Sequence, residues 1–401
     1  MRKILLIVLF MNVFNIGYSQ SKKAFSLDND VLLQNKKILK LNSDVNVTTA
    51  YQRLQKEGEI VLAAPLPSVT KKKLTASSTD IHDYVSLATY WWPNPNKKDG
   101  LPYVAIDGKV NPEVKSVKDY NNLVKLSSYI KTLGLLYYFS GDEKYIQKAN
   151  FLLRTWFVND KTKMNPNLNH AQFIKGVNKG RIEGTIETRF FVDLIDGMQL
   201  IANSDNFQEK DYSSIKGWFS AYLDWLENSE IGAKGFDLKN NIGTSYHMQR
   251  ISFYLLLGKE DKLKKIQQDN LKRLLEIQFE NDGKQPLEVK RSSPWNYSVA
   301  NLEYWLKINQ MYKNVNVNLV DYQVNGGYPL KNAFAYLSKN KTKIEDWEYK
   351  QKSKIDFKDF DKISNTYSGK SIKLMPNKNA KQKKVIMNIE DAIFILTNNN
   401  I

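Results

Sequence analysis

The chain has 401 residues, a formal net charge of +17 and no cysteine. Without cysteine there are no disulfides, thiol nucleophiles or cysteine-ligated metals, so stability must come from a buried core. The positive charge favours a polyanionic partner, which could be a nucleic acid, an anionic lipid or an acidic glycan.

Residues 1–19 have the pattern of a signal peptide. Arg2 and Lys3 precede an apolar run at 4–10, and Gly17-Tyr18-Ser19 provides small residues for cleavage. The apolar run is shorter than the roughly 20 residues that a membrane-spanning helix needs. We therefore expect a periplasmic or secreted protein without membrane insertion, and an acidic polysaccharide as its partner, with no nucleic acid.

The remaining chain divides into segments of different pattern. Residues 27–75 predict an N-terminal helical layer, and 76–118 contain too many prolines and glycines for a long helix, so they predict a structured loop. From residue 119 onward, apolar residues three and four positions apart predict helices at 119–140, 143–157, 184–203, 210–228, 243–257, 260–280 and 297–313. Short connections between these helices favour a ring or array of antiparallel hairpins.

After about residue 340 the chain is rich in lysine and weakly patterned. Its one apolar run, Ala392 to Leu396, is compatible with a late helix or a strand. The sequence therefore predicts a main domain at 20–340 and a basic C-terminal tail at 341–401 whose packing is left open.

Three polar or aromatic stretches are candidates for function. Trp91 and Trp92, in a proline-rich loop, suit stacking on sugar rings, although they would equally well plug the mouth of a helical ring. His170, Gln172 and Arg181 form the second stretch, where the glycines around Arg181 predict a tight loop that presents a guanidinium to a carboxylate.

The third candidate is a pair of polar loops at 239–249 and 285–298. Each loop precedes an apolar helix, and two predicted helices separate them. Neighbouring hairpins of a ring would place both loops at the same end, and an active site requires that kind of convergence.

In their order and spacing, these motifs resemble the alginate-lyase superfamily of polysaccharide lyases over about residues 80–320. The resemblance rests on Trp92-Pro93-Asn94-Pro95, Gly100-Leu101-Pro102-Tyr103, Asp107-Gly108, Ala171-Gln172, Gly180-Arg181, Asn240-Asn241, Gln285-Pro286-Leu287-Glu288, Arg291 and Tyr297-Ser298. It implies a mainly all-α fold, an incomplete (α/α) toroid of antiparallel helix hairpins with long irregular loops at the active-site rim. It also implies cleavage of a uronic-acid-containing polysaccharide by β-elimination, to unsaturated oligosaccharides.

The resemblance also implies roles for individual residues. Asn241 and Arg291 match the residues that neutralise the uronate carboxylate, and Tyr297 matches the residue that transfers protons. We expect the Arg291 guanidinium to lower the pKa of the Tyr297 phenol. The residues expected to contact substrate elsewhere are Trp91, Trp92, His170, Gln172, Arg181 and Asn240.

One position departs from the family pattern, because Ile242 stands where the family usually has a histidine. Isoleucine transfers no proton. Tyr246, one helical turn further on, is a candidate replacement. His247 and His170 are two more, although a structural role is the simpler explanation for each histidine.

The favoured substrate is mannuronate-rich alginate, with glucuronan or another polyuronate next. No metal or cofactor is expected, because the Asn and Arg side chains can neutralise the carboxylate themselves. One alternative is a polyuronate-binding protein whose catalysis is impaired. The other is a glycoside hydrolase on a similar toroid, which would need two acids from among Glu183, Glu187 and Glu288.

Overall fold

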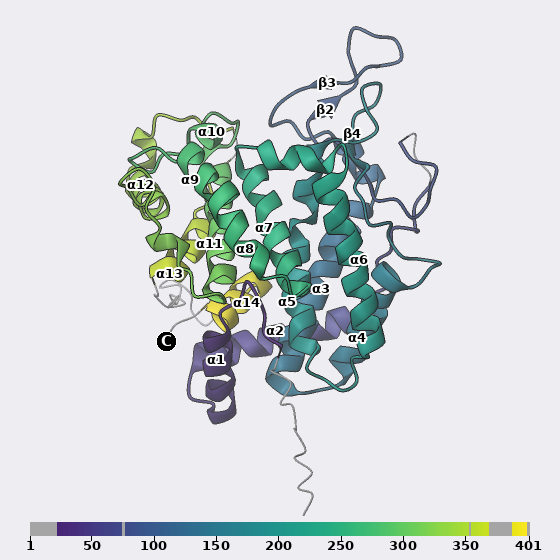
Figure 1. Cartoon of the computed structure of the whole chain (residues 1–401), viewed down its shortest axis with the longest axis vertical. Helices are drawn as coiled ribbons and strands as arrows, with labels where there is room; N and C mark the ends of the chain where they lie inside the picture. The colour runs from purple at the N-terminus through teal and green to yellow at the C-terminus, as the bar shows by residue number, and fades with distance from the viewer. Residues whose placement is uncertain (1–21, 74–76, 353, 369–386, 399–401) are drawn as a thin grey trace, which may run out of the picture.

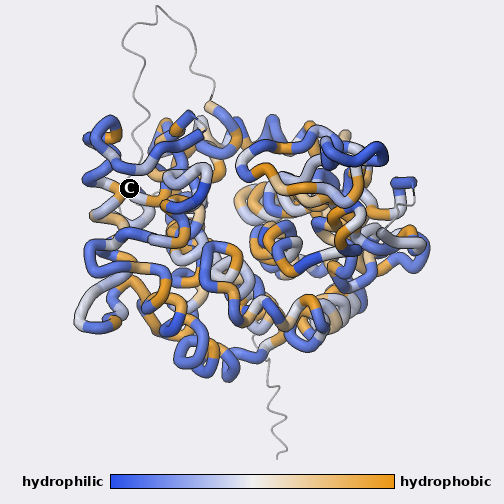
Figure 2. The backbone as a smooth tube through the Cα atoms, turned by 90° about the horizontal axis from the view of Figure 1, so that it is seen from above, coloured by the Kyte–Doolittle hydropathy of each residue, from blue (hydrophilic) through white to orange (hydrophobic). Residues whose placement is uncertain are grey.

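The computed structural model describes residues 22–73, 77–352, 354–368 and 387–398, so the predicted signal peptide lies outside the described residues. The fold is mainly helical, as predicted, and the helices stand side by side as a ring (Figures 1 and 2). The α-helices are α1 Asn29–Leu41, α2 Val45–Ala63, α3 Asp119–Ser140, α4 Lys144–Leu153, α5 Phe191–Ile201, α6 Glu209–Asn228, α7 Asn241–Leu256, α8 Asp261–Ile266, α9 Lys272–Gln278, α10 Pro286–Val289, α11 Pro294–Lys313, α12 Pro329–Thr342, α13 Lys358–Ser368 and α14 Ile389–Asn398.

Short non-α turns connect or extend several of these helices. The 3₁₀ segments are η1 Pro112–Ser116, η3 Ile182–Phe190, η4 Gly232–Asp237, η6 Leu319–Asp321 and η7 Ile344–Asp346, and the π-helical turns are η2 Arg154–Val158 and η5 Gln267–Leu271. The predicted helix at 184–203 therefore begins as a 3₁₀ segment and becomes an α-helix only at Phe191.

Helices α3 and α5 pack closely because each has a glycine at the crossing. A β-carbon at Gly134 would lie 2.4 Å from the Gly197 carbonyl oxygen, and one at Gly197 would lie 2.4 Å from the Ile130 carbonyl oxygen. Side chains at these positions would force the backbones apart, so the glycines permit this part of the ring to close.

Four short strands lie at the loop end of the ring, where the sequence predicted only irregular structure. Strand β1 (Val85–Leu87) pairs in parallel with β4 (His170–Phe173), and β2 (Trp91–Trp92) pairs antiparallel with β3 (Val104–Ala105). Runs of two to four residues carry no period-2 pattern that distinguishes them from a loop. Figure 1 shows β2, β3, β4 and α10 at the same end of the molecule.

The two ends of the described chain meet. Helix α14 packs against α1 and α2, and buried Asn35 donates its amide hydrogens to the carbonyls of Ile395 and Leu396 at 3.2 and 3.0 Å (Figure 1). The apolar run at 392–396 is thus a helix that covers the N-terminal layer. Among the described helices, none combines the length and apolar character needed to cross a membrane.

The segment after residue 340 also supports the start of α11. Trp295, 1% exposed, has edge-to-face contacts with Trp347, Phe357 and Phe360. The Trp295 N–H, in the first turn of α11, donates to Gln351 Oε1 at 3.0 Å. A residue far along the chain therefore fixes the first turn of the helix that carries Tyr297.

Candidate active site

The first turn of α7 presents Asn241. Asn240 caps the helix by accepting the Ile242 N–H at 3.1 Å, so its side chain has a structural contact in addition to any contact with substrate. A β-carbon at Gly243 would lie 2.1 Å from the Leu238 carbonyl oxygen, which is why the turn before α7 can be so tight. Asn241 is 3% exposed, and its Oδ1 atom has no hydrogen-bond partner among the described residues.

Glu288 joins this turn to the loop that follows α9. Its Oε1 accepts the Asn241 N–H at 2.7 Å, and its own carbonyl accepts the Arg291 N–H at 3.1 Å. The Glu288 side chain therefore holds the start of α7, and its main chain belongs to the turn that leads to Arg291. Burial raises the pKa of Glu288 from 4.5 to about 7, although the Asn241 N–H and Arg291 oppose the shift.

Glu288 is expected to make stability depend on pH. Because its pKa is higher in the folded state than in the unfolded state, its contribution to stability is present at low pH and is lost as pH rises from about 4.5 to 7. In the wild-type protein the free energy of unfolding should therefore decrease between pH 5 and 8, and Glu288→Gln should make that decrease smaller by up to about 3 kcal/mol. Urea unfolding at both pH values measures this, with exposed Glu276→Gln as the control that leaves the slope unchanged.

Arg291 and Tyr297 form the second half of the site. The Arg291 guanidinium carbon lies 4.3 Å from the centre of the Tyr297 ring, and a guanidinium nitrogen lies 4.0 Å from Asp107. The Tyr297 hydroxyl is hydrogen-bonded to the Tyr90 hydroxyl at 3.1 Å. Three loops, those around residues 90, 107 and 291, thus converge on the half-buried phenol.

The expected lowering of the Tyr297 pKa does not occur. Burial and the hydrogen bond to Tyr90 raise the pKa of Tyr297 above its ordinary value, and they outweigh the opposite effect of Arg291. The reason is that the guanidinium lies over the ring face, while the hydroxyl is in a desolvated contact with the Tyr90 hydroxyl. Tyr297 therefore carries its proton at neutral pH.

The tryptophan pair lies on the short β2–β3 hairpin next to Tyr90. Trp92 donates its indole N–H to the Lys109 carbonyl at 2.9 Å, and the Lys109 ammonium lies 4.4 Å from the centre of the indole ring. Both tryptophans are partly exposed, so neither is a buried plug. Their place beside the Tyr90 loop fits the contact role better than the plug role.

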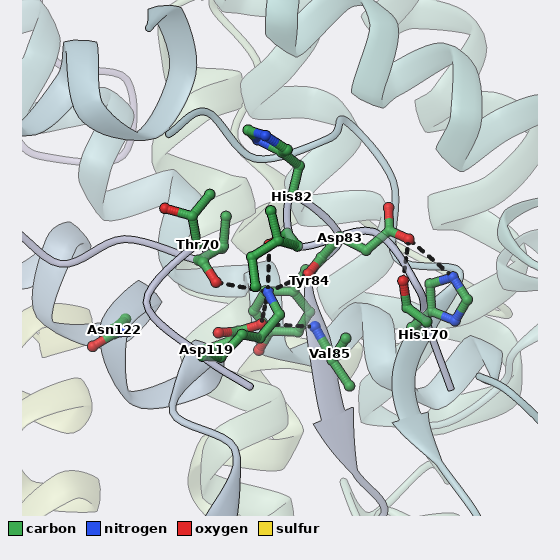
Figure 3. A network of polar contacts seen from close by, with 12 residues as sticks. Thr70, His82, Asp83, Tyr84, Val85, Asp119, Asn122 and His170 are labelled. Carbon is green, nitrogen blue, oxygen red and sulfur yellow. Dashed lines mark hydrogen bonds and ion pairs between the residues drawn. The ribbon is translucent and has the colours of Figure 1, made fainter. Parts of the chain in front are cut away.

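His170 is held by groups of its own loop region. Its Nδ1 is hydrogen-bonded to Ser77 Oγ at 2.9 Å, and its Nε2 lies 3.2 Å from Asp83 Oδ2. Figure 3 shows the imidazole of His170 facing the Asp83 carboxylate. Ser77 Oγ also donates to the Lys179 carbonyl at 2.5 Å, so it is no free nucleophile despite its position beside the histidine. His170 is placed to hold the loops at 77–83 and 179 together.

A buried ion pair lies under β1 in the same region. Lys72 contacts Asp119 at 2.8 Å, with side chains 5% and 1% exposed. Asp119 also accepts the Val85 N–H at 3.0 Å (Figure 3). Asp119 therefore holds β1 against the start of α3. The loop that leads from β1 to Tyr90 is positioned in the same way.

Gln172 and Arg181 adjoin β4 and η3. Gln172 has φ of +48°, and its N–H donates to Ser86 Oγ at 2.8 Å, while its side chain is one of the groups that oppose the rise in the pKa of Glu187. Arg181 pairs with Glu183 at 3.0 Å and is partly exposed, so its guanidinium keeps a face toward solvent. Both residues lie at the loop end of the ring, and each already has a partner.

Tyr246 and His247 point into the core and not toward the Arg291 loop. Tyr246 is fully buried and donates its hydroxyl to the Leu226 carbonyl on α6 at 2.8 Å. His247 is fully buried as well and receives a hydrogen bond from Arg250 at 2.9 Å. Burial, Arg250 and Arg273 lower the pKa of His247, so it stays neutral. Neither side chain replaces the histidine that Ile242 displaces.

The acids that a glycoside hydrolase would need are all engaged. Glu183 pairs with Arg181, buried Glu187 accepts from the hydroxyls of Tyr84 and Ser86 at 2.7 Å, and Glu288 holds the Asn241 N–H. In the described parts of the chain, no three histidine, aspartate or glutamate side chains are grouped to hold a metal ion.

Sequence reasoning overlooked three contributors to the site. Tyr90 and Asp107 lie in the loop at 76–118, where nothing local indicates that their side chains reach the Arg291 loop. Glu288 belongs to a family motif, but the only role that the sequence suggested for it was that of a hydrolase acid, whereas its contacts place it between Asn241 and Arg291. Its position in a motif with Pro286, at the start of a one-turn helix, was the available signal.

The comparisons with known proteins identify the family and the fold. The family model described as alginate lyase matches residues 68–347. The crystal structure of an alginate lyase from Bacteroides ovatus is 34% identical with a TM-score of 0.81, and the match covers 87% of this chain and 93% of that one. Alginate lyase A1-III in complex with a tetrasaccharide, 14% identical with a TM-score of 0.54 and 88% of each chain covered, shares the fold. None of the curated proteins matches the chain.

Proposed function

The chain belongs to the alginate lyase family and is a polysaccharide lyase; from that premise, we propose that it cleaves mannuronate-rich alginate by β-elimination at the rim formed by α7, α10 and α11. The observation that carries the proposal is the linkage of Asn241, Glu288, Arg291 and Tyr297 through direct contacts. The solved relatives are themselves described as alginate lyases.

The first requirement of the reaction is neutralisation of the uronate carboxylate, which makes the C5 proton acidic. We assign this to the Asn241 amide, which is rigidly held by its helix turn, and to the Arg291 guanidinium, which is partly exposed and able to form two parallel hydrogen bonds. Both groups are in place before substrate binds, so little reorganisation is needed in the transition state.

The second requirement is the transfer of a proton from C5 to the departing O4. We assign it to Tyr297, whose raised pKa keeps the phenol neutral. The phenol donates its proton to O4 as the C4–O4 bond breaks, and its oxygen receives the C5 proton. The electron pair of the C5–H bond becomes the C4–C5 double bond, and Tyr297 ends the cycle protonated.

A single phenol can serve both atoms only where the C5 hydrogen and O4 lie on the same face of the ring. That condition holds in mannuronate and glucuronate and fails in guluronate. Ile242 removes the histidine that would serve the opposite face, and neither Tyr246 nor His247 reaches this rim. We therefore expect turnover of polymannuronate, then glucuronan, with polyguluronate the poorest substrate.

The proposal is tested by incubating the enzyme with each of these three polymers. Appearance of the ultraviolet absorbance of a 4,5-unsaturated uronate supports it. Reducing ends without that absorbance would indicate hydrolysis. Saturable binding with no product after long incubation would favour the impaired binding protein, for which Ile242 is the supporting observation.

Trp92 is expected to contribute to polymer affinity. Trp92→Ala should raise KM about 3- to 10-fold with kcat nearly unchanged, because a stacking contact of about 0.5–1.5 kcal/mol is lost away from the reacting atoms. Trp92→Phe retains an aromatic face and should show a smaller effect. A fall in kcat alone would place Trp92 in the chemistry instead.

We also propose export to the periplasm or the exterior on the pattern of residues 1–19. N-terminal sequencing of the mature protein tests this, with Gln20 expected as the first residue. An intact Met1 in exported protein would contradict it.

A further inference from the structure

A polar cavity lies apart from the candidate active site at the rim. It has a volume of about 840 Å³ and is lined by parts of α1, α3, α5, α11, α13 and α14. Helix α11 connects the two places, because Tyr297 is in its first turn and Lys307 of the cavity wall is ten residues further on. At 1.5 Å per residue, this separation is roughly 15 Å along the helix axis.

The cavity wall carries an unusual set of charges. Asp193 lies between two ammonium groups, Lys131 at 2.9 Å and Lys307 at 3.2 Å, and Lys307 also lies 3.7 Å from Glu303. Burial would raise the pKa of Asp193, but the two lysines hold it below its ordinary value, so the carboxylate stays charged. This group of four residues is electrically balanced.

Arg189, on the same wall, adds a positive charge that has no acid in direct contact, although Glu303 acts on it from a greater distance. Its guanidinium donates to the Ile186 carbonyl at 2.8 Å and lies 4.0 Å from the centre of the Phe190 ring. Among the described residues, no carboxylate oxygen lies within 4.0 Å of it. Glu187, two residues earlier, is held by the hydroxyls of Tyr84 and Ser86.

We propose that this cavity is a second binding site, separate from the rim, for a small hydroxylated monocarboxylate such as a monomeric uronate. An arginine whose guanidinium has N–H groups to spare can donate two parallel hydrogen bonds to a planar carboxylate. Glu303 and Asp193 provide acceptors for sugar hydroxyls. They also disfavour a dianion such as phosphate, because the five lysine and arginine side chains of the wall are matched by five carboxylates.

The existence of the site does not depend on the lyase activity, but the choice of a uronate as its ligand rests on the proposed function. The test uses sodium glucuronate as the probe, in calorimetric titration and in thermal unfolding. We expect one glucuronate to bind and to raise the melting temperature, since a ligand that binds only the native state stabilises it. Glucose and inorganic phosphate should do neither.

Two variants separate this site from the rim. Arg189→Gln should weaken glucuronate binding at least tenfold, with Arg189→Lys intermediate, whereas Arg291→Gln should leave it unchanged. Binding that is lost in Arg291→Gln and kept in Arg189→Gln would place the ligand at the rim and overturn the proposal. Absence of a melting-temperature shift in the wild-type protein would overturn it without any variant, and phosphate binding as tight as glucuronate would refute the carboxylate assignment.

Discussion

Replacing Tyr297 by phenylalanine is expected to lower kcat on polymannuronate by about 10²- to 10⁴-fold, the usual contribution of a positioned proton-transfer group. Affinity for the polymer should change little, because the ring and its contact with Arg291 remain. Initial rates from ultraviolet absorbance give kcat, and calorimetry with a short oligomannuronate gives Kd.

The matched control for this variant is Tyr90→Phe. It removes the other hydroxyl of the same 3.1 Å hydrogen bond but leaves the Tyr297 phenol in place. We expect a loss of less than about tenfold in kcat, since Tyr90 acts through Tyr297 and does not itself carry the proton. If Tyr297→Phe kept near-full rate, or if the two variants were equally impaired, Tyr297 would not be the proton-transfer residue.

Arg291→Ala is expected to reduce kcat/KM by about 10²- to 10³-fold, with losses in both kcat and substrate affinity. The reason is that the guanidinium contacts the carboxylate in the ground state and interacts more strongly with it as charge develops toward the enolate. Steady-state kinetics over a range of oligomannuronate concentrations separate the two effects.

Arg291→Lys is the control that keeps the positive charge but removes the planar guanidinium group. It should recover part of the affinity but little of kcat, because an ammonium contacts one carboxylate oxygen at a time. If Arg291→Ala bound the substrate normally and lost only kcat, Arg291 would act on Tyr297 and not on the substrate carboxylate.

Much of the fold was predictable because the helices after residue 119 have strong apolar periodicity. The helices predicted at 210–228 and 297–313 agree closely with α6 and α11. Helices α12 and α13 were missed. The buried residues of α12, Leu330, Ala333, Phe334 and Leu337, do have helical spacing, whereas α13 has few apolar residues and depends on tertiary partners, such as Trp295 against Phe360.

The site was predictable only in part. Motif order placed Asn241 and Arg291 in loops at one end of the ring, and the structure joins those loops through Glu288. The sign of the Tyr297 pKa shift was wrong, because desolvation depends on how Tyr90 and the surrounding loops cover the hydroxyl. A helical wheel also gave no warning that α7 is buried almost all round, which leaves Tyr246 and His247 in the core.

A crystal structure of the Tyr297→Phe protein with a bound oligomannuronate tests the account most directly. We expect one uronate carboxylate to be hydrogen-bonded to both the Asn241 amide and the Arg291 guanidinium, with the C5 hydrogen and O4 of that sugar facing the ring at position 297. A sugar chain that crosses the rim with its carboxylates turned away from Asn241 and Arg291, or that lies beyond reach of position 297, would contradict it.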